Sequence, residues 1–322
     1  MSRSPQLRPH LRPSLRPFLR QAGLTLPEMM VAIAIGLAVL LAAARLLELA
    51  NGAYAAQSDS AALDDAGRYA LELVGRAVRQ AAHVDPLQLD LSAPLDVLPA
   101  RLDGLDAISL GGATAGIGTP LTAVANGSDV LAVRFPGAGA GPGGDGSLLD
   151  CAGFGVGAGE EGWSIFYVAK NADGEAELRC KYHGAARWSA DAVVSGVDSF
   201  QVLYGLDTDT PRDGAANRYV NADAIRALDA ALGAGLPPQE LKRRTWWKRV
   251  VSVRVALLLH GARPIRNDRG GQEFQLFGPA YAAGAAQGDP GTVLREDALP
   301  EGLRRRERRL FSATVALPAG AL

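Results

Sequence analysis

The longest apolar run of the chain lies near the N-terminus and predicts a helix that can span a membrane. It extends from Leu24 to Ala44 and reads LTLPEMMVAIAIGLAVLLAAA, with Glu28 as its only charged residue. At ~1.5 Å per residue such a helix is about 30 Å long, which matches the hydrocarbon core of a bilayer. We therefore expect a transmembrane helix over residues 24–48.

Small and apolar residues then recur at steps of three and four, which predicts an amphipathic continuation of the helix over residues 49–84. The positions that carry this spacing are Leu63, Ala66, Ala70, Leu73, Ala77 and Ala81. Asn51-Gly52 is a candidate break or bend, and Asp85-Pro86 marks the expected end of the helix.

Residues 85–322 contain short segments rich in β-branched and aromatic residues, which predict a globular head built of strands. The candidate strands are 129–135, 163–169, 176–182, 197–204, 248–259 and 308–316, with a short helix near 222–233. Apolar residues at every second position of 249–259 give that strand one wholly apolar face. The expected fold class is α+β, a long helix packed on an antiparallel sheet with long loops.

The distribution of charge sets the expected topology. The chain has 33 Lys and Arg residues against 34 Asp and Glu, so it is not a uniformly basic nucleic-acid binder, and its 48% hydrophobic content excludes an intrinsically disordered chain. Residues 1–23, however, contain five arginines and no acid. Basic flanks stay on the cytoplasmic side, so we expect a single-pass inner-membrane protein whose head is periplasmic.

This topology places Cys151 and Cys180 in an oxidising compartment, where a solitary pair of cysteines usually forms a disulfide. We expect that bond here, and two buried thiols are the alternative.

The junction between the basic leader and the apolar run resembles the class III signal of type IV pilins and type II secretion pseudopilins. Gly23 matches the last leader residue, Leu24 the first mature residue and Glu28 the fifth. The resemblance implies that a prepilin peptidase removes residues 1–23 and methylates Leu24, and that Glu28 pairs with the methylated amine of an adjacent subunit. Leu24 stands where Phe is commoner, and Pro27 is tolerated in the first helical turn.

Later segments resemble the PilW family of type IV pilus minor pilins. They are the stretch from Ile165 to Cys180, VDSFQVLYG at 197–205, RYV at 218–220, VVSVRV at 250–255 and RLFSATVAL at 309–317. The resemblance implies a pilin-like fold and a minor pilin that helps prime pilus assembly and remains near the pilus tip. Its partners would be other minor pilins, the major pilin, the prepilin peptidase and the inner-membrane assembly machinery. A pseudopilin of the same architecture and a membrane-anchored adhesin are the alternatives.

Three segments of the head have candidate binding chemistry. Asp207, Asp209 and Asp213 resemble part of a calcium loop, although an Asp-rich turn explains the same residues. The basic and aromatic residues of 242–249 could contact DNA, but a loop whose tryptophans cover the head is the preferred interpretation, and we expect no nucleic-acid partner. The Gly139-x-Gly141-x-x-Gly144 pattern is interpreted as a flexible loop.

The sequence lacks the motifs of common catalytic sites. It has no Gly-x-Ser-x-Gly, no His-Glu-x-x-His and no Walker loop, so we expect neither an enzyme nor a cofactor. The arginine-rich segment 304–309 is expected to be an exposed strand start that discourages edge pairing.

Overall fold

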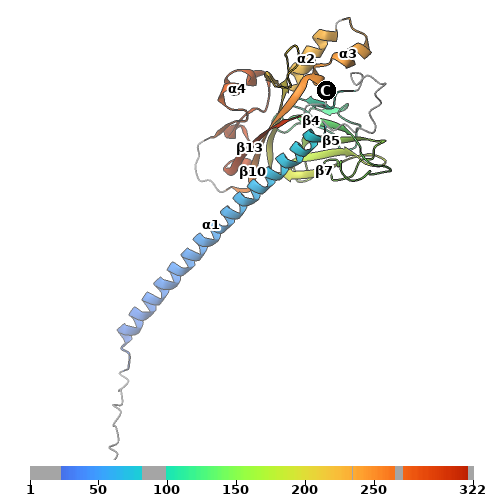
Figure 1. The fold of residues 1–322 in the computed structure, drawn as a ribbon. Helices are drawn as coiled ribbons and strands as arrows, with labels where there is room; N and C mark the ends of the chain where they lie inside the picture. Colours follow the sequence, from blue (N-terminus) through green and yellow to red (C-terminus); the bar gives the residue numbers. More distant parts are fainter. Residues whose placement is uncertain (1–22, 82–98, 234, 265–270, 318–322) are drawn as a thin grey trace, which may run out of the picture. The chain divides into compact units, whose positions relative to one another are not determined.

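The computed structural model describes residues 23–81, 99–233, 235–264 and 271–317 (Figure 1). Its elements are α1 (Leu26–Gln80), β1 (Leu102–Leu105), β2 (Ser109–Leu110), β3 (Pro120–Leu121), β4 (Val130–Pro136), β5 (Glu161–Lys170), β6 (Ala176–His183), β7 (Trp188–Ser195), β8 (Val197–Leu206), β9 (Arg218–Val220), α2 (Ala222–Gly233), α3 (Pro238–Arg244), the 3-10 helix η2 (Trp246–Arg249), β10 (Val250–Pro264), β11 (Glu273–Gln275), α4 (Pro279–Ala283), the 3-10 helix η3 (Ala285–Gly288), β12 (Val293–Arg295), the 3-10 helices η4 (Glu296–Ala298) and η5 (Glu301–Leu303), and β13 (Arg306–Ala316). The chain divides into two compact units at Ala55 and Ala56, which are described separately.

Helix α1 runs from Leu26 to Gln80 and continues through Asn51-Gly52, so it does not break at this candidate position. Alanine and leucine dominate the residues on both sides of this pair, and a single internal glycine costs only about 1 kcal/mol relative to alanine. The neighbouring helix formers outweigh that cost. The helix ends before Asp85-Pro86, which lies outside the described residues.

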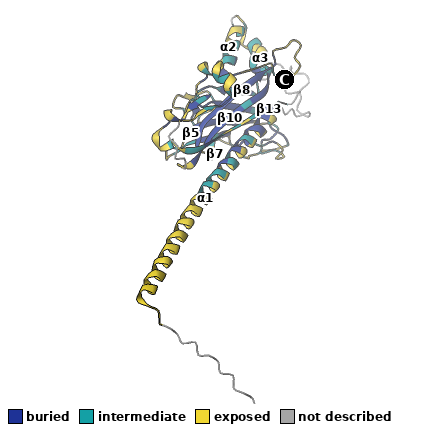
Figure 2. Cartoon of the chain, turned by 90° about the vertical axis from the view of Figure 1, so that its left-hand side faces the viewer, coloured by how far each residue is buried: buried dark blue, intermediate teal, exposed yellow. Residues whose placement is uncertain are grey.

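The two parts of α1 differ in burial (Figure 2). Every residue from Leu26 to Tyr54 is exposed, whereas Leu63, Ala70, Leu73 and Ala77 are buried in the unit that contains the sheets. These four positions are among those that the amphipathic spacing selected. Gly67 and Gly75 belong to the same buried face, where the absence of a side chain lets another element approach.

The strands form two main antiparallel sheets. The first has the order β1-β4-β5-β6-β7 and the second the order β13-β10-β8-β9. The chain passes from one sheet to the other at Gly196, between β7 and β8, where φ is +75° and a Cβ atom would lie 2.6 Å from the carbonyl oxygen of His260. Only glycine tolerates both the left-handed backbone and this close approach.

The main core lies between the C-terminal part of α1 and both sheets. It includes Val74 from α1, Phe166 from the first sheet and Val255 from the second. The loop around β2 and β3 covers the outer face of the first sheet, and the segment that contains β11 and β12 covers the other face of the second. Strand β8 is therefore buried at every position, and β10 is buried on both faces rather than on one.

Each candidate strand from the sequence pattern corresponds to an observed strand, and α2 occupies the expected helix position. Three starts differ by two residues. The strand expected over 248–259 begins at Val250, because Trp246–Arg249 form η2, whereas β5 and β13 each begin two residues before the expected start. The Gly-dense stretch 137–159 contains no element beyond an isolated bridge between Leu149 and Gly155. Strand β7 escaped detection because its sequence, WSADAVVS, is polar and half exposed at the sheet edge.

The expectation of an exposed arginine segment at 304–309 is wrong for Arg308. Its side chain is 0% exposed, and its guanidinium forms ion pairs with Asp198 and Glu296. Alternate residues of a strand point to opposite faces, so β13 directs Arg308 inward. Arg309, the next residue, instead forms an ion pair with Asp64 of α1.

Candidate functional site

The segment that begins α1 contains three of the predicted site residues side by side. Gly23 and Leu24 lie in irregular, exposed backbone immediately before the helix, and Glu28 lies in its first turn. No atom lies within 4 Å of the position that a Cβ atom on Gly23 would take. Residues 1–22 of the expected leader lie outside the described residues.

Glu28 caps the N-terminus of α1 through hydrogen bonds with Thr25. One carboxylate oxygen of Glu28 accepts hydrogen bonds from the backbone N–H of Thr25 at 2.9 Å and from its hydroxyl at 2.8 Å. The N–H of Met29 donates to the Thr25 carbonyl at 3.1 Å and forms the first helical bond. A Thr followed three residues later by Glu is the capping-box signature, in which the Glu reaches back to the N-cap N–H. The sequence interpretation of Glu28 overlooked this use of Thr25.

The residues after this cap present a continuous apolar surface. Side chains such as Leu26, Ile33, Val39 and Leu49 are each more than half exposed in the structure. By length and composition, α1 can cross a membrane, and within the described residues it is the helix that meets this test. A water-exposed surface of this kind is stable only when lipid or other apolar helices cover it.

The two cysteines form the expected disulfide. Cys151 and Cys180 are joined with a Cα–Cα distance of 5.8 Å, and both residues are buried. Cys180 belongs to β6, whereas Cys151 belongs to the loop between β4 and β5. The bond therefore fastens that long loop to the first sheet.

The structure brings the three acids of the candidate cation loop together after β8. Each of Asp207, Asp209 and Asp213 offers a carboxylate oxygen, and these atoms lie within 4.8 Å of one another. The carboxylate of Asp207 accepts the N–H groups of Gly214 at 2.8 Å and Asp209 at 3.0 Å, and the Gly214 bond is the main cause that lowers its pKa. These bonds are those of an Asp-rich turn. Binding of a cation stays a prediction.

The tryptophans of the basic segment 242–249 cover the head, as expected. Trp247 is buried and packs edge-on against Tyr204, with 4.9 Å between ring centroids. The guanidinium of Arg249 lies 4.8 Å from the ring centroid of Trp246. The indoles therefore pack on protein groups. In the Gly139-x-Gly141-x-x-Gly144 segment all three glycines have positive φ, and the next element is strand β5 rather than the helix that a dinucleotide site needs.

Comparisons with known proteins found family models that match the N-terminal segment and the C-terminal half of the chain. The family model of the prokaryotic N-terminal methylation motif matches residues 19–44, and that of the type IV pilus-assembly protein W matches residues 165–319. Among solved structures, a type IV-like pilin from Thermus thermophilus is similar, with 18% identity, a TM-score of 0.27, and coverage of 70% of this chain and 89% of its own. No curated protein matches the chain at a significant level.

A methylation motif at the start of one long helix, an exposed apolar first part, and a second part packed on antiparallel sheets together define a type IV pilin-like protein. The second family match extends from β5 through β13 and contains every strand of the second sheet. Residues 165–319, just under half of the chain, match the model of the type IV pilus-assembly protein W, and this match together with the methylation motif supports a PilW-family pilin. Domains of this family are structural proteins, and the motif with its apolar helix indicates membrane anchoring and pilus assembly.

Proposed function

We propose that this protein is a minor pilin that helps prime type IV pilus assembly and is incorporated near the pilus tip. The observation that supports this role is the first part of α1, which combines a processing signal, a capped N-terminus and a fully exposed apolar surface. Such a helix can lie in the membrane before assembly and against neighbouring helices afterwards, because both surroundings are apolar. Its partners are other minor pilins, the major pilin and the inner-membrane assembly machinery.

Processing follows from the junction at Gly23. The prepilin peptidase cuts after Gly23 on the cytoplasmic face and methylates the amine of Leu24, which leaves the arginines of the leader behind. Gly23 is exposed and lacks a side chain that would keep the peptidase from the backbone. The Gly23→Val variant should keep its leader, run more slowly on a gel and fail to leave the membrane. An N-terminus at Met1 in wild-type, piliated cells contradicts this proposal.

Glu28 supplies the charge that sets the position of this subunit against its neighbour. A carboxylate in the membrane is costly unless it has a partner, and the methylated amine of an adjacent subunit is that partner. The hydrogen bonds from Thr25 hold the carboxylate at the N-terminus of α1 until the amine arrives. Because Glu28 is present, we place this subunit beneath another pilin-like subunit rather than alone at the extreme tip.

Three variants separate the charge of Glu28 from its role as a helix cap. Glu28→Ala removes both, Glu28→Gln keeps an acceptor for Thr25 but removes the charge, and Thr25→Val keeps the charge but removes the hydroxyl. All three should be cleaved and inserted. Piliation of a deletion strain should fail with both Glu28 variants and be restored by Thr25→Val, as scored in sheared surface preparations. Normal pilus numbers with Glu28→Gln at native expression contradict the charge role.

The expected topology places the N-terminus in the cytoplasm and the head in the periplasm, from which the subunit reaches the pilus at the cell surface. The disulfide between Cys151 and Cys180 supports this placement, because such bonds persist in oxidising compartments. Protease added to spheroplasts should digest the head. A protected head contradicts the topology.

Deletion of the gene distinguishes priming from the two alternatives. Loss of surface pili supports priming. Normal pili with failed protein secretion identify a pseudopilin, and normal pili with failed attachment identify an adhesin; either result contradicts the proposed function.

A further inference from the structure

Strand β13 lies at one edge of the second sheet, and within the described residues it pairs with β10 alone. The backbone N–H of Leu317 donates to the carbonyl of Val251 at 2.8 Å, and the two strands are antiparallel. In such a pair every second residue bonds to the partner strand, so Val315 and alternate residues before it bond to β10. The residues between them direct their N–H and C=O groups away from β10. We call these residues the β13 edge: Leu310, Ser312, Thr314 and Ala316.

The side chains of the β13 edge are exposed as well, and Leu310 is 41% exposed. Their neighbours along the strand face the other way. Val315 is buried in the main core, and the Phe311 ring lies where a Cβ atom on Gly67 of α1 would be. The inward residues therefore hold β13 against α1, while the β13 edge presents both backbone groups and side chains to the surroundings.

The β13 edge lacks the features that keep the other edges of the two main sheets from pairing. Short length, charged residues, prolines and bulges protect sheet edges in natural proteins. Strands β1 and β9 have four and three residues, and β7 contains Asp191 and a register irregularity against β6. The segment from Leu310 to Ala316, LFSATVA, has no charge, proline or glycine, and its register with β10 is regular. It is a template on which another strand can form.

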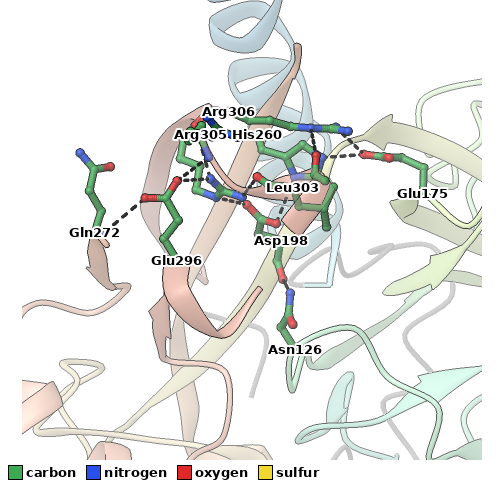
Figure 3. A network of polar contacts seen from close by, with 11 residues as sticks. Asn126, Glu175, Asp198, His260, Gln272, Glu296, Leu303, Arg305 and Arg306 are labelled. Atoms are coloured by element: carbon green, nitrogen blue, oxygen red, sulfur yellow. Dashed lines mark hydrogen bonds and ion pairs between the residues drawn. The ribbon is translucent and has the colours of Figure 1, made fainter. Parts of the chain in front are cut away.

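The start of β13 is already bound within the head (Figure 3). The guanidinium of Arg306 lies 3.6 Å from a carboxylate oxygen of Glu175, and the N–H of Arg305 donates to Glu296 at 2.8 Å. Arg308 is buried beside these groups. The charged residues therefore fix the beginning of the strand, and the open part is the uncharged segment that follows.

Helix α1 and β13 run in the same direction, which restricts what can pair with the β13 edge. The hydroxyl of Ser60 donates to Glu307 near the start of β13, at 3.2 Å, and Gly75 lies against Val315 near its end. Copies anchored in one membrane have their α1 helices in the same direction, so their β13 strands also point the same way. An antiparallel pair of two β13 strands would need one head to be turned over.

We propose that the β13 edge accepts an edge strand of a different pilin subunit, running opposite to β13, so that the sheets of two neighbouring heads become continuous. This inference rests on the proposed function, which supplies another membrane-anchored pilin as the partner. Backbone hydrogen bonds provide the attraction, and the side chains beside Leu310 and Thr314 select the partner strand. Because both subunits are held in one membrane, their effective concentration is high and a short strand pair is enough.

Amide hydrogen exchange tests whether the edge is open. In the full-length protein in detergent micelles, the amides of the β13 edge should exchange at least about a thousandfold faster than those of Phe311, Ala313 and Val315, which bond to β10. Equal protection of both sets in the monomer would mean that the chain itself covers the edge, and it overturns the proposal.

Photo-crosslinking in piliated cells tests the partner. A benzophenone amino acid replaces Thr314 at native expression, and the same replacement of Asp191 on the edge strand β7 is the control. Mass spectrometry should find Thr314 joined to a strand of a different chain that carries a prepilin signal, with no such product from position 191. A product with a second copy of this chain, or no product from position 314, contradicts the proposal.

A proline on the edge tests the role in assembly, with Thr314→Val as the matched control. Thr314→Pro removes an N–H that has no bond to β10, and edge strands tolerate proline at such positions. Thr314→Val keeps the N–H and the shape of the side chain. Both variants should be processed and keep the bond between Cys151 and Cys180.

In a deletion strain, Thr314→Val should restore surface pili and Thr314→Pro should not. Normal pili with Thr314→Pro overturn the docking of a strand on β13 but leave the proposed function intact. The proposed function fails by a different result, namely normal pili in the deletion strain itself.

Discussion

Asp106 is a buried acid whose protonation should make the head more stable as the pH falls. It follows β1 and is 9% exposed. Its two carboxylate oxygens accept the N–H groups of Ala222 at 3.0 Å and Asp223 at 2.7 Å, which begin helix α2. Burial, together with the nearby charges of Asp289 and Asp223, raises the pKa of Asp106 from 3.8 to about 6, against the two backbone bonds that lower it.

The size of the effect follows from this pKa. Above pH ~6 the carboxylate is ionised in both the folded and the unfolded chain, and the folded state carries the full cost of burying it. Below pH ~6 the folded state binds a proton that the unfolded state does not bind until about pH 4, so the free energy of unfolding rises as the pH falls. At about 1.4 kcal/mol per pH unit, the whole window from 6 to 3.8 is worth about 3 kcal/mol.

The assay compares Asp106→Asn with the wild type. The asparagine keeps an oxygen for the N-terminus of α2 but cannot ionise, so its unfolding free energy should lack this part of the pH dependence. Urea titrations of the full-length protein in detergent micelles, followed by tryptophan fluorescence between pH ~4 and ~7, measure the difference. Asp173→Asn is the control, because Asp173 is an exposed acid in the turn between β5 and β6 and is not among the charges that raise the pKa of Asp106, so it should leave the slope unchanged.

The difference in unfolding free energy between the wild type and Asp106→Asn reports on Asp106 alone. Other buried acids, such as Asp129, contribute equally to both proteins, although burial also raises the pKa of Asp129. A difference that stays constant from pH ~4 to ~6 would refute the reasoning. It would mean that the two N–H bonds outweigh the cost of burying the charge.

Three further changes test packing and covalent links. Cys151→Ser should lower the free energy of unfolding by about 3–4 kcal/mol, since the bond closes a loop with a separation of 29 residues; as a check, the unreduced wild type should contain no thiol that can be alkylated. Trp247→Ala should cost about 3–5 kcal/mol in the same urea assay because the indole is 8% exposed and packs on Tyr204; unchanged stability would contradict its burial. Gly67→Val should destabilise the head by about 1–3 kcal/mol, because its Cβ would overlap the Phe311 ring, whereas Gly52→Val, with no atom within 4 Å, should have little effect on head stability.

Local patterns were enough to predict the long helix, six of the thirteen strands in the described residues, and the methylation motif. The spacing of Leu63, Ala70, Leu73 and Ala77 identified the buried face of α1, because helix periodicity depends only on neighbouring residues. Cys151 and Cys180 could be paired because the expected topology places the head in an oxidising compartment and the chain has two cysteines.

Other features depend on which strands lie side by side. The exposed arginine segment was a reasonable inference from composition, yet Arg308 meets Asp198, a residue 110 positions away, and is fully buried. The burial of both faces of β10 likewise depends on the segment from β11 to β12, which covers the second sheet from outside.

By itself, the sequence determined the long helix, its division into an exposed apolar part and an amphipathic part, and the signal at Gly23, since these are repeated or contiguous local patterns. Tertiary structure alone decided that His260 lies between Asp198 and Glu175, the latter 85 positions away. A side chain's partners across a sheet are fixed by strand order and register, and a shift of one residue would turn it to the opposite face.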